Sequence, residues 1–456
     1  MPSPLGSLPS INELLESPPL KALVDRVNPA RVMTSVRSFV DGMRLELQTA
    51  VAQRQIPSPL ALAEQIANWI VRQDQAGVRN VLNGTGILLH PELGGAPLAD
   101  EALAALRSAA ASYSRIPTAG AKPTRVEQLL QELTGCETAV VTPNAALAIG
   151  LLTKALAYGK EVLIPRCQLL TAADGSRGYE LLTAAGAKLQ EVGAANELTI
   201  NDLSRAGDSA FLFWQHDLPS TATQPSLAEV GTWAQRHSVS LIVDLGSGGL
   251  NDGAAFGIAA QPTAAAAIQA GATAVIVRGD GLLGGPGCAI IAGKSSLISK
   301  LLADPLARTA NTDKATLAAL EATLELYRPA ADPASNHIER SIPLLGLLAA
   351  SADNLKHRCE RLSPQLAASP ALAAVEPRAD FAWLTAAKLD SQKLPTWGLT
   401  LQPAQGTAAD LLAALSNTTP AVIGSLAGDR VWIDLRAISP REDQQLVNAV
   451  NQLAAK

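Results

Sequence analysis

Two strand-like segments of this 456-residue chain end in a charged side chain and continue into a glycine-rich loop. One apolar run leads into Asp244, which is followed by Leu245-Gly246-Ser247-Gly248. The other leads into Arg278, and its loop closes with Gly284-Gly285-Pro286, a sequence typical of a sharp change of direction. Because α/β proteins bind ligands beyond the carboxyl ends of such strands, these strand ends indicate a ligand site. The alternative is that Asp244 only caps the turn after it.

A third segment of this kind, residues 139–141, is followed by Thr142, Pro143, Asn144 and Ala145, where a helix is expected to begin. The first backbone N–H groups of a helix have no partner within the helix and lie at its positive end. A phosphate group binds well at such a junction. Many strand-to-helix junctions share this pattern, so a purely structural role stays open as well.

The elements that must position these residues alternate along the middle of the chain. Such alternation predicts an α/β fold with a mostly parallel sheet and helices on both faces. The predicted strands are residues 139–141, 161–164, 188–192, 210–214, 240–243 and 274–277. The predicted helices between them are residues 145–157, 175–184, 226–236 and 262–269.

The pattern divides the chain into three predicted domains. Residues 1–75 read as a helical domain in which seven basic and seven acidic side chains balance, so a solvated face and an RNA-binding face are both open. Residues 76–330 form the large domain, and a helix over residues 313–327 leads out of it. Residues 331–456 read as a small α/β domain with a helix over 342–352 and strands over 381–387, 398–402, 420–425 and 430–436.

Composition excludes several classes of protein. The net charge of −5 argues against indiscriminate binding of nucleic acid, DNA included. The four cysteines lie far apart without a C-x-x-C spacing, which predicts free thiols and no metal site. The chain shows no signal-peptide pattern and no apolar run long enough for a membrane span, so we expect a cytoplasmic protein with no membrane partner.

The two glycine-rich motifs, D-L-G-S-G-G-L from Asp244 and R-G-D-G-L-L-G-G-P from Arg278, resemble those of the bacterial selenocysteine synthase (L-seryl-tRNA(Sec) selenium transferase) family. The start of the chain around residues 8–15 and the segment over residues 79–98 are similar to that family too. The resemblance implies the fold type I of pyridoxal-phosphate (PLP) dependent transferases. It also implies the family's reaction, in which serine on tRNA(Sec) is dehydrated and selenium is added from selenophosphate.

The resemblance also assigns roles to single residues. In the family motif a lysine holds PLP as a Schiff base, and here Gly281 occupies that position. The resemblance therefore gives this chain no catalytic residue, and any PLP would be held without a covalent bond. The cofactor-binding residues that it implies are Thr142, Asn144, Ala145, Asp244, Ser247 and Arg278. The substrate-binding residues that it implies are Lys122, Arg125 and Arg308.

Three hypotheses for function follow from this resemblance and from the glycine at position 281. The chain is an enzyme of the family's reaction, or a pseudoenzyme that binds tRNA(Sec) or a catalytic paralogue, or an enzyme for another small anionic substrate. Because fold type I enzymes build their sites across a dimer face, a homo-oligomer of at least two chains is expected by analogy.

Overall fold

The structure, a computed structural model, describes residues 9–24, 29–49, 57–75, 77–115, 123–204, 209–259, 261–328 and 338–453. The chain divides into two compact units. The first comprises Met1–Asn80 with Thr419–Ala421, and the second comprises Val81–Thr418 with Val422–Lys456. The three-domain division with boundaries at residues 75 and 330 stays a prediction.

The first unit is helical, as the sequence predicts for the N-terminal region. Ser10 begins its first helix by accepting a hydrogen bond from the Glu13 backbone N–H at 3.2 Å, which satisfies one of the open donors of that helix. A core of fully buried aliphatic side chains such as Val36 and Ile66 joins the helices, and Phe39 packs edge-on against Trp69. The helices are α1 (Ile11–Leu15), α2 (Pro18–Val24), α3 (Pro29–Thr49) and α4 (Pro59–Gln75).

The second unit contains a seven-stranded sheet with the order β3-β9-β8-β7-β6-β4-β5. Strands β5, β4, β6, β7 and β8 run parallel, whereas β9 pairs antiparallel with both β8 and β3. The expectation of a mostly parallel sheet is therefore confirmed. The strands are β3 (Thr138–Thr142), β4 (Glu161–Pro165), β5 (Lys188–Val192), β6 (Phe211–Gln215), β7 (Ser240–Asp244), β8 (Ala274–Arg278) and β9 (Ala289–Gly293).

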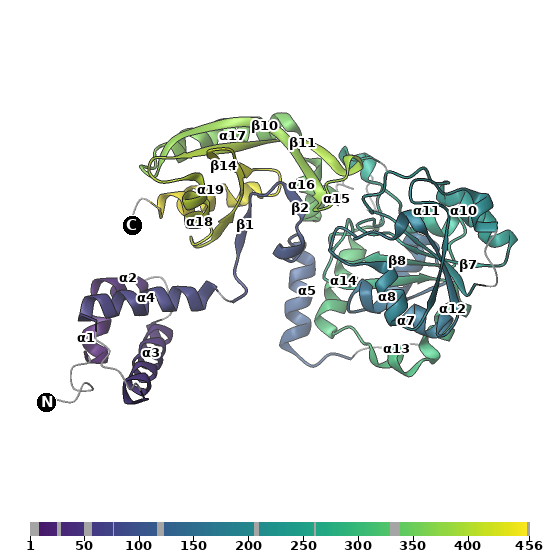
Figure 1. Ribbon diagram of the computed structural model, residues 1–456, viewed down its shortest axis with the longest axis horizontal. Coiled ribbons are helices and arrows are strands. Elements are labelled where there is room, and N and C mark those ends of the chain that lie inside the picture. The colour runs from purple at the N-terminus through teal and green to yellow at the C-terminus, as the bar shows by residue number, and fades with distance from the viewer. Residues whose placement is uncertain are drawn as a thin grey trace. The chain divides into compact units, whose positions relative to one another are not determined.

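Helices cover both faces of this sheet, as Figure 1 shows for β7 and β8. One face packs against α7 (Ala145–Ala157), α8 (Gly178–Ala184) and α12 (Ser295–Ala303). The other packs against α6 (Arg125–Thr134), α10 (Leu227–Arg236), α11 (Ala264–Gln269) and α14 (Lys314–Glu325). Shorter or peripheral helices are α5 (Asp100–Ala111), α9 (Ile200–Ser204) and α13 (Pro305–Thr309).

Strand alternation decides which side chains face α7. Phe213 of β6, Ile242 of β7 and Ile276 of β8 all belong to the core on the α7 side. Because side chains two residues apart on a strand point to the same face, the last residue of each strand follows them. These three strand ends are Gln215, Asp244 and Arg278. The sequence pattern therefore places three polar side chains together beside the face that α7 covers.

A second, five-stranded sheet has the order β13-β14-β11-β10-β2, and β1 pairs with β12 in a separate ribbon. Its long hairpin differs from the prediction, because β10 starts nine residues before the expected residue 381 and its first half is largely solvent-facing. The predicted helix over 342–352 is also wrong at its end. It stops at Ala349, and a longer helix begins at Ala352, where Ser351 caps it through the Asn354 N–H at 3.2 Å.

The elements around this sheet complete the second unit. The strands are β1 (Val81–Asn83), β2 (Ile87–Leu89), β10 (Leu372–Thr385), β11 (Lys393–Pro403), β12 (Ala421–Ile423), β13 (Ser425–Ala427) and β14 (Arg430–Asp434). The helices are α15 (Ile338–Ser341), α16 (Pro343–Ala349), α17 (Ala352–Ala367), α18 (Ala408–Leu415) and α19 (Asp443–Asn451). None of the helices in the described ranges is long and apolar enough to cross a membrane.

Candidate functional site

Asp244 lies at the centre of the polar group at the strand ends and is completely buried. Its carboxylate accepts hydrogen bonds from Gln215 Nε2 and from the Gly246 backbone N–H, both at 3.1 Å. The Arg278 guanidinium approaches the same carboxylate, with Nη2 at 4.0 Å from Oδ2. Burial raises the pKa of Asp244, although Arg278 and the hydrogen bonds pull that pKa the other way.

Arg278 also binds a second carboxylate. Its Nη1 forms an ion pair with Asp174, which lies in the loop before α8. Asp174 in turn fixes that loop by accepting hydrogen bonds from Ser176, through the backbone N–H at 2.9 Å and Oγ at 2.6 Å. Burial raises the pKa of Asp174, but Arg278 and Ser176 outweigh it and leave that pKa lowered. The guanidinium thus lies between two acids, and its buried Nε has no hydrogen-bond partner among the described residues.

Gly281, at the position of the family's lysine, packs against the backbone of the β7 loop. The N–H of the next residue, Leu282, donates a hydrogen bond to the Ser247 carbonyl at 2.8 Å, and this draws the two loops together. A Cβ atom added at position 281 would lie 2.9 Å from that same carbonyl oxygen. Such an approach is closer than real Cβ atoms tolerate, so no side chain fits here without a backbone shift.

Ser247 belongs to a neighbouring polar cluster. Its backbone N–H and its Oγ both donate hydrogen bonds to one oxygen of Asp217, while Gln392 Nε2 donates to the other oxygen at 2.8 Å. Thr385 Oγ1 holds Gln392 by donating to its Oε1 at 2.6 Å. These contacts join the large sheet to the β10–β11 hairpin. Burial raises the pKa of Asp217, although its bonds with Ser247 lower it.

The proposed phosphate junction forms as the local sequence predicts. Asn144 caps α7 by accepting a hydrogen bond from the Leu147 N–H at 2.8 Å. Thr142 Oγ1 donates to the Asn144 carbonyl at 3.1 Å and to that of Ala289 at 3.3 Å. Ala145 is the first residue of the helix. Both polar side chains hold the strand–helix junction itself, and their assignment to a cofactor stays a prediction.

No contact among the described residues joins Arg125 to Arg308, two of the residues assigned to the substrate. Arg125 donates to Glu325 Oε1 through Nε at 2.8 Å and Nη2 at 2.6 Å, which ties α6 to α14. Arg308 is exposed on α13. Lys122 lies outside the described residues. Among the contacts of the described residues, none joins Arg125 or Arg308 to Asp244, and their role in substrate binding stays a prediction.

His216 follows β6 and lies beside the site. Its backbone N–H donates to the Asp244 carbonyl at 2.9 Å, but its buried Nε2 has no hydrogen-bond partner among the residues that the structure describes. Burial lowers the pKa of His216 to about 4. The imidazole is therefore neutral near neutral pH.

This depressed pKa predicts a pH-dependent stability. The unfolded chain takes up a proton at His216 below about pH 6.5, whereas the folded chain does so only near pH 4. Stability from His216 is thus present above the unfolded pKa and lost as the pH falls, by roughly 2 kcal/mol between about pH 7.5 and about pH 5. Urea denaturation at both pH values should show that the free energy of unfolding falls less between the higher and the lower pH for His216→Gln than for the wild type. The same substitution at the exposed His357 is the control, and an equal loss in all three proteins would contradict the assignment.

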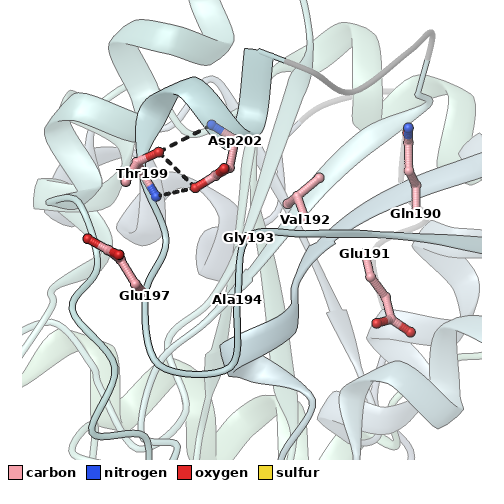
Figure 2. Close-up of a pocket in the computed structure, with 8 residues that line it drawn as sticks. All are labelled: Gln190, Glu191, Val192, Gly193, Ala194, Glu197, Thr199 and Asp202. Carbon is pink, nitrogen blue, oxygen red and sulfur yellow. Dashed lines mark hydrogen bonds between the residues drawn. The ribbon is translucent and has the colours of Figure 1, made fainter.

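A separate cavity of about 530 Å³ opens beside the edge strand β5. Figure 2 shows the residues that line it, among them Glu191, Glu197 and Asp202, with Thr199 hydrogen-bonded to Asp202. The lining contains none of the residues around Asp244. No group of three potential metal ligands occurs within the described residues, and the four cysteines are buried and free. We therefore take the strand ends around Asp244 as the candidate site.

The sequence did not reveal several residues of this site. Asp174, Gln215 and Gln392 lie in segments without a recognisable motif, and Gln392 is 145 residues from Ser247 along the chain. A usable signal existed for Gln215 alone, whose place at the end of a predicted strand beside that of Asp244 brings it to the same sheet edge.

Comparison with known proteins covers nearly the whole chain. A sequence model of the family described as L-seryl-tRNA selenium transferase matches residues 81–439, and one described as selenocysteine synthase N terminal matches residues 5–44. The L-seryl-tRNA(Sec) selenium transferase of Moorella thermoacetica is 35% identical over 98% of this chain and 96% of its own length. That of Carboxydothermus hydrogenoformans is 31% identical over 96% and 95% respectively.

Among solved structures, D-glucosaminate-6-phosphate ammonia-lyase shares the fold. Its TM-score is 0.58 at 19% sequence identity, and the match covers 84% of this chain and 99% of that one. At this identity the likeness concerns the fold alone.

Proposed function

The chain belongs to the L-seryl-tRNA selenium transferase family, and on this premise we propose that it serves selenocysteine synthesis as a tRNA(Sec)-binding protein that does not carry out the transfer itself. It is selenocysteine synthase-like over almost its full length and has the α/β architecture of PLP-dependent fold type I. We thus assign to this chain the binding of tRNA(Sec) but not the transfer of selenium.

Pyridoxal phosphate is the cofactor that the family and the fold assign to the chain by resemblance. When bound, it supplies an electron sink for carbanion chemistry at the substrate's Cα. Covalent attachment needs a lysine amine, and position 281 carries a glycine packed against the Ser247 carbonyl. The residues present do not fit a covalently held cofactor, and the proposed role of the chain therefore requires no step that passes through it.

The packing of Gly281 is the observation that carries the proposal. A lysine at this place would serve both as the attachment point and as the base that moves the Cα proton. Asp244 and Arg278 are held in contact with each other. The Arg278 guanidinium stays protonated, so it can neither accept the Cα proton nor form an imine. His216 is neutral but has no nucleophile among its contacts with the described residues.

Retention of the N-terminal unit supports the binding role. Residues 5–44 match the family's N-terminal model, and the four helices have a buried core of their own. The relatives are named for an activity on seryl-tRNA(Sec). Because the chain has a net charge of −5, we propose that it recognises the shape of one tRNA rather than nucleic acid in general.

Assembly and location complete the proposal. We infer at least a homodimer by analogy with fold type I proteins, and a catalytic paralogue is the natural additional partner of a chain without the lysine. We place the protein in the cytoplasm, where aminoacyl-tRNA is made. Light scattering of the purified chain, alone and mixed with a lysine-bearing paralogue, measures both kinds of assembly.

Two assays on the purified protein test the function. With seryl-tRNA(Sec) and selenophosphate, we expect no selenium transfer above background, whereas the Moorella thermoacetica relative serves as the positive control. In a filter-binding titration, tRNA(Sec) should bind more tightly than tRNA(Ser) at the same salt concentration. Clear transfer by the pure protein would reject the non-catalytic role. Salt-sensitive binding that does not discriminate between the two tRNAs would reject the tRNA-binding role.

A further inference from the structure

The charges around Asp244 are balanced by the protein itself. Asp244 is completely buried, and a buried carboxylate requires a compensating positive charge or hydrogen bonds. The resemblance to the selenium transferase family places Asp244 against the ring nitrogen of PLP, and the protonated nitrogen would supply such a charge. Here Arg278 Nη2 lies 4.0 Å from the carboxylate, and the Arg278 side chain is only 17% exposed.

The loop before α8 holds that guanidinium in place. Asp174 pairs with Arg278 Nη1 and accepts two hydrogen bonds from Ser176, so the carboxylate is itself fixed. Arg278 is at the end of β8, where strand alternation already directs it toward the α7 face beside Asp244. The position of the guanidinium is therefore fixed by the strand that carries Arg278 and by its contacts with two acids, Asp174 and Asp244.

We propose that Arg278 is a built-in counter-ion that replaces the cofactor's ring nitrogen beside Asp244 and closes this site to pyridoxal phosphate. A second cation beside Asp244 would meet the guanidinium as a like charge in a buried region. This interpretation opposes the assignment of Arg278 as a cofactor-binding residue. The counter-ion proposal rests on the proposed function because it concerns the same site. Its test uses neither tRNA nor a transfer assay, so the counter-ion proposal and the proposed function can fail separately.

The test is a titration with pyridoxine 5′-phosphate, which has the ring and the phosphate of the cofactor but no aldehyde, so it forms no imine with surface lysines. Isothermal titration calorimetry is applied to the full chain, to Arg278→Ser and to Arg177→Ser. Arg177 is the matched control because it is an arginine of the loop that carries Asp174, and its ion pair with Glu180 is solvent-exposed. We expect no saturable binding to the wild type or to the control, and saturable binding to Arg278→Ser with a dissociation constant at least tenfold below the highest probe concentration used.

Each outcome decides the proposal. Saturable binding to the wild type that Arg278→Ser weakens would make Arg278 a cofactor-binding residue and overturn it. A folded Arg278→Ser variant that binds no better than the wild type would overturn it as well. If that variant does not fold, Arg278→Gln replaces it, because this change removes the positive charge beside Asp244 and keeps a long polar side chain. A folded Arg278→Gln variant should then gain binding of the probe, and no gain would reject the proposal.

Discussion

The Gly281→Lys variant is expected to lose about 1–3 kcal/mol of unfolding free energy and to remain unable to trap pyridoxal phosphate on the new side chain. The new Cβ would lie 2.9 Å from the Ser247 carbonyl oxygen, so the β7 and β8 loops must separate before a lysine fits. Their separation breaks the hydrogen bond from the Leu282 N–H to the same carbonyl. Restoring one residue type therefore does not restore the site.

The matched control for this variant is Gly287→Lys. Gly287 lies in the same loop, and a Cβ added there would have its nearest neighbour at 3.9 Å. Urea denaturation should place the control close to the wild type and Gly281→Lys well below it. Borohydride reduction in the presence of the cofactor, followed by peptide mass mapping, shows whether the side chain at position 281 carries an adduct. A stable variant with a quantitative adduct there would show that the pocket had been retained and only the lysine lost.

The fold could be largely predicted because its pattern is local. The alternation of apolar runs with helical segments marked six of the seven strands of the large sheet, and the strand list left out β9. That Phe213, Ile242 and Ile276 face the same side of the sheet follows from strand geometry alone. The ends of β6, β7 and β8 then come together as they do in any parallel sheet. The strand pattern predicted a ligand site at these strand ends, and the family resemblance assigned Asp244 and Arg278 to it; the two side chains do lie close to each other.

The rest depended on contacts that sequence spacing does not report. Asp174 and Arg278 are 104 residues apart, and no pattern in the sequence around Asp174 indicates that its carboxylate binds Arg278. The same holds for Gln392, which reaches Asp217 from the second sheet across 175 residues. The early start of β10 was missed because exposed residues in a paired hairpin lack a strong apolar alternation.

A buried ion pair in the second sheet's helical layer is another such contact, and it supports the second large prediction. Arg358 of α17 donates to both Asp443 oxygens through Nε, at 2.9 and 3.1 Å, and to one of them through Nη2 at 2.6 Å. Its guanidinium also donates to the carbonyls of Leu435 at 3.0 Å and Ile438 at 2.8 Å. Arg358 and Asp443 have side chains that are only 6% and 7% exposed.

The Arg358→Ala variant is expected to lose about 3–5 kcal/mol of unfolding free energy, because it leaves the Asp443 carboxylate and two carbonyl groups buried without this partner. Urea denaturation followed by circular dichroism measures the loss. Arg361→Ala is the matched control, since Arg361 pairs with the same carboxylate from the same helix but has a side chain that is 58% exposed. A solvent-exposed pair contributes at most about 1 kcal/mol, so the control should stay near the wild type. Equal losses in the two variants would mean that charge alone, and not the buried hydrogen bonds of Arg358, joins α17 to α19.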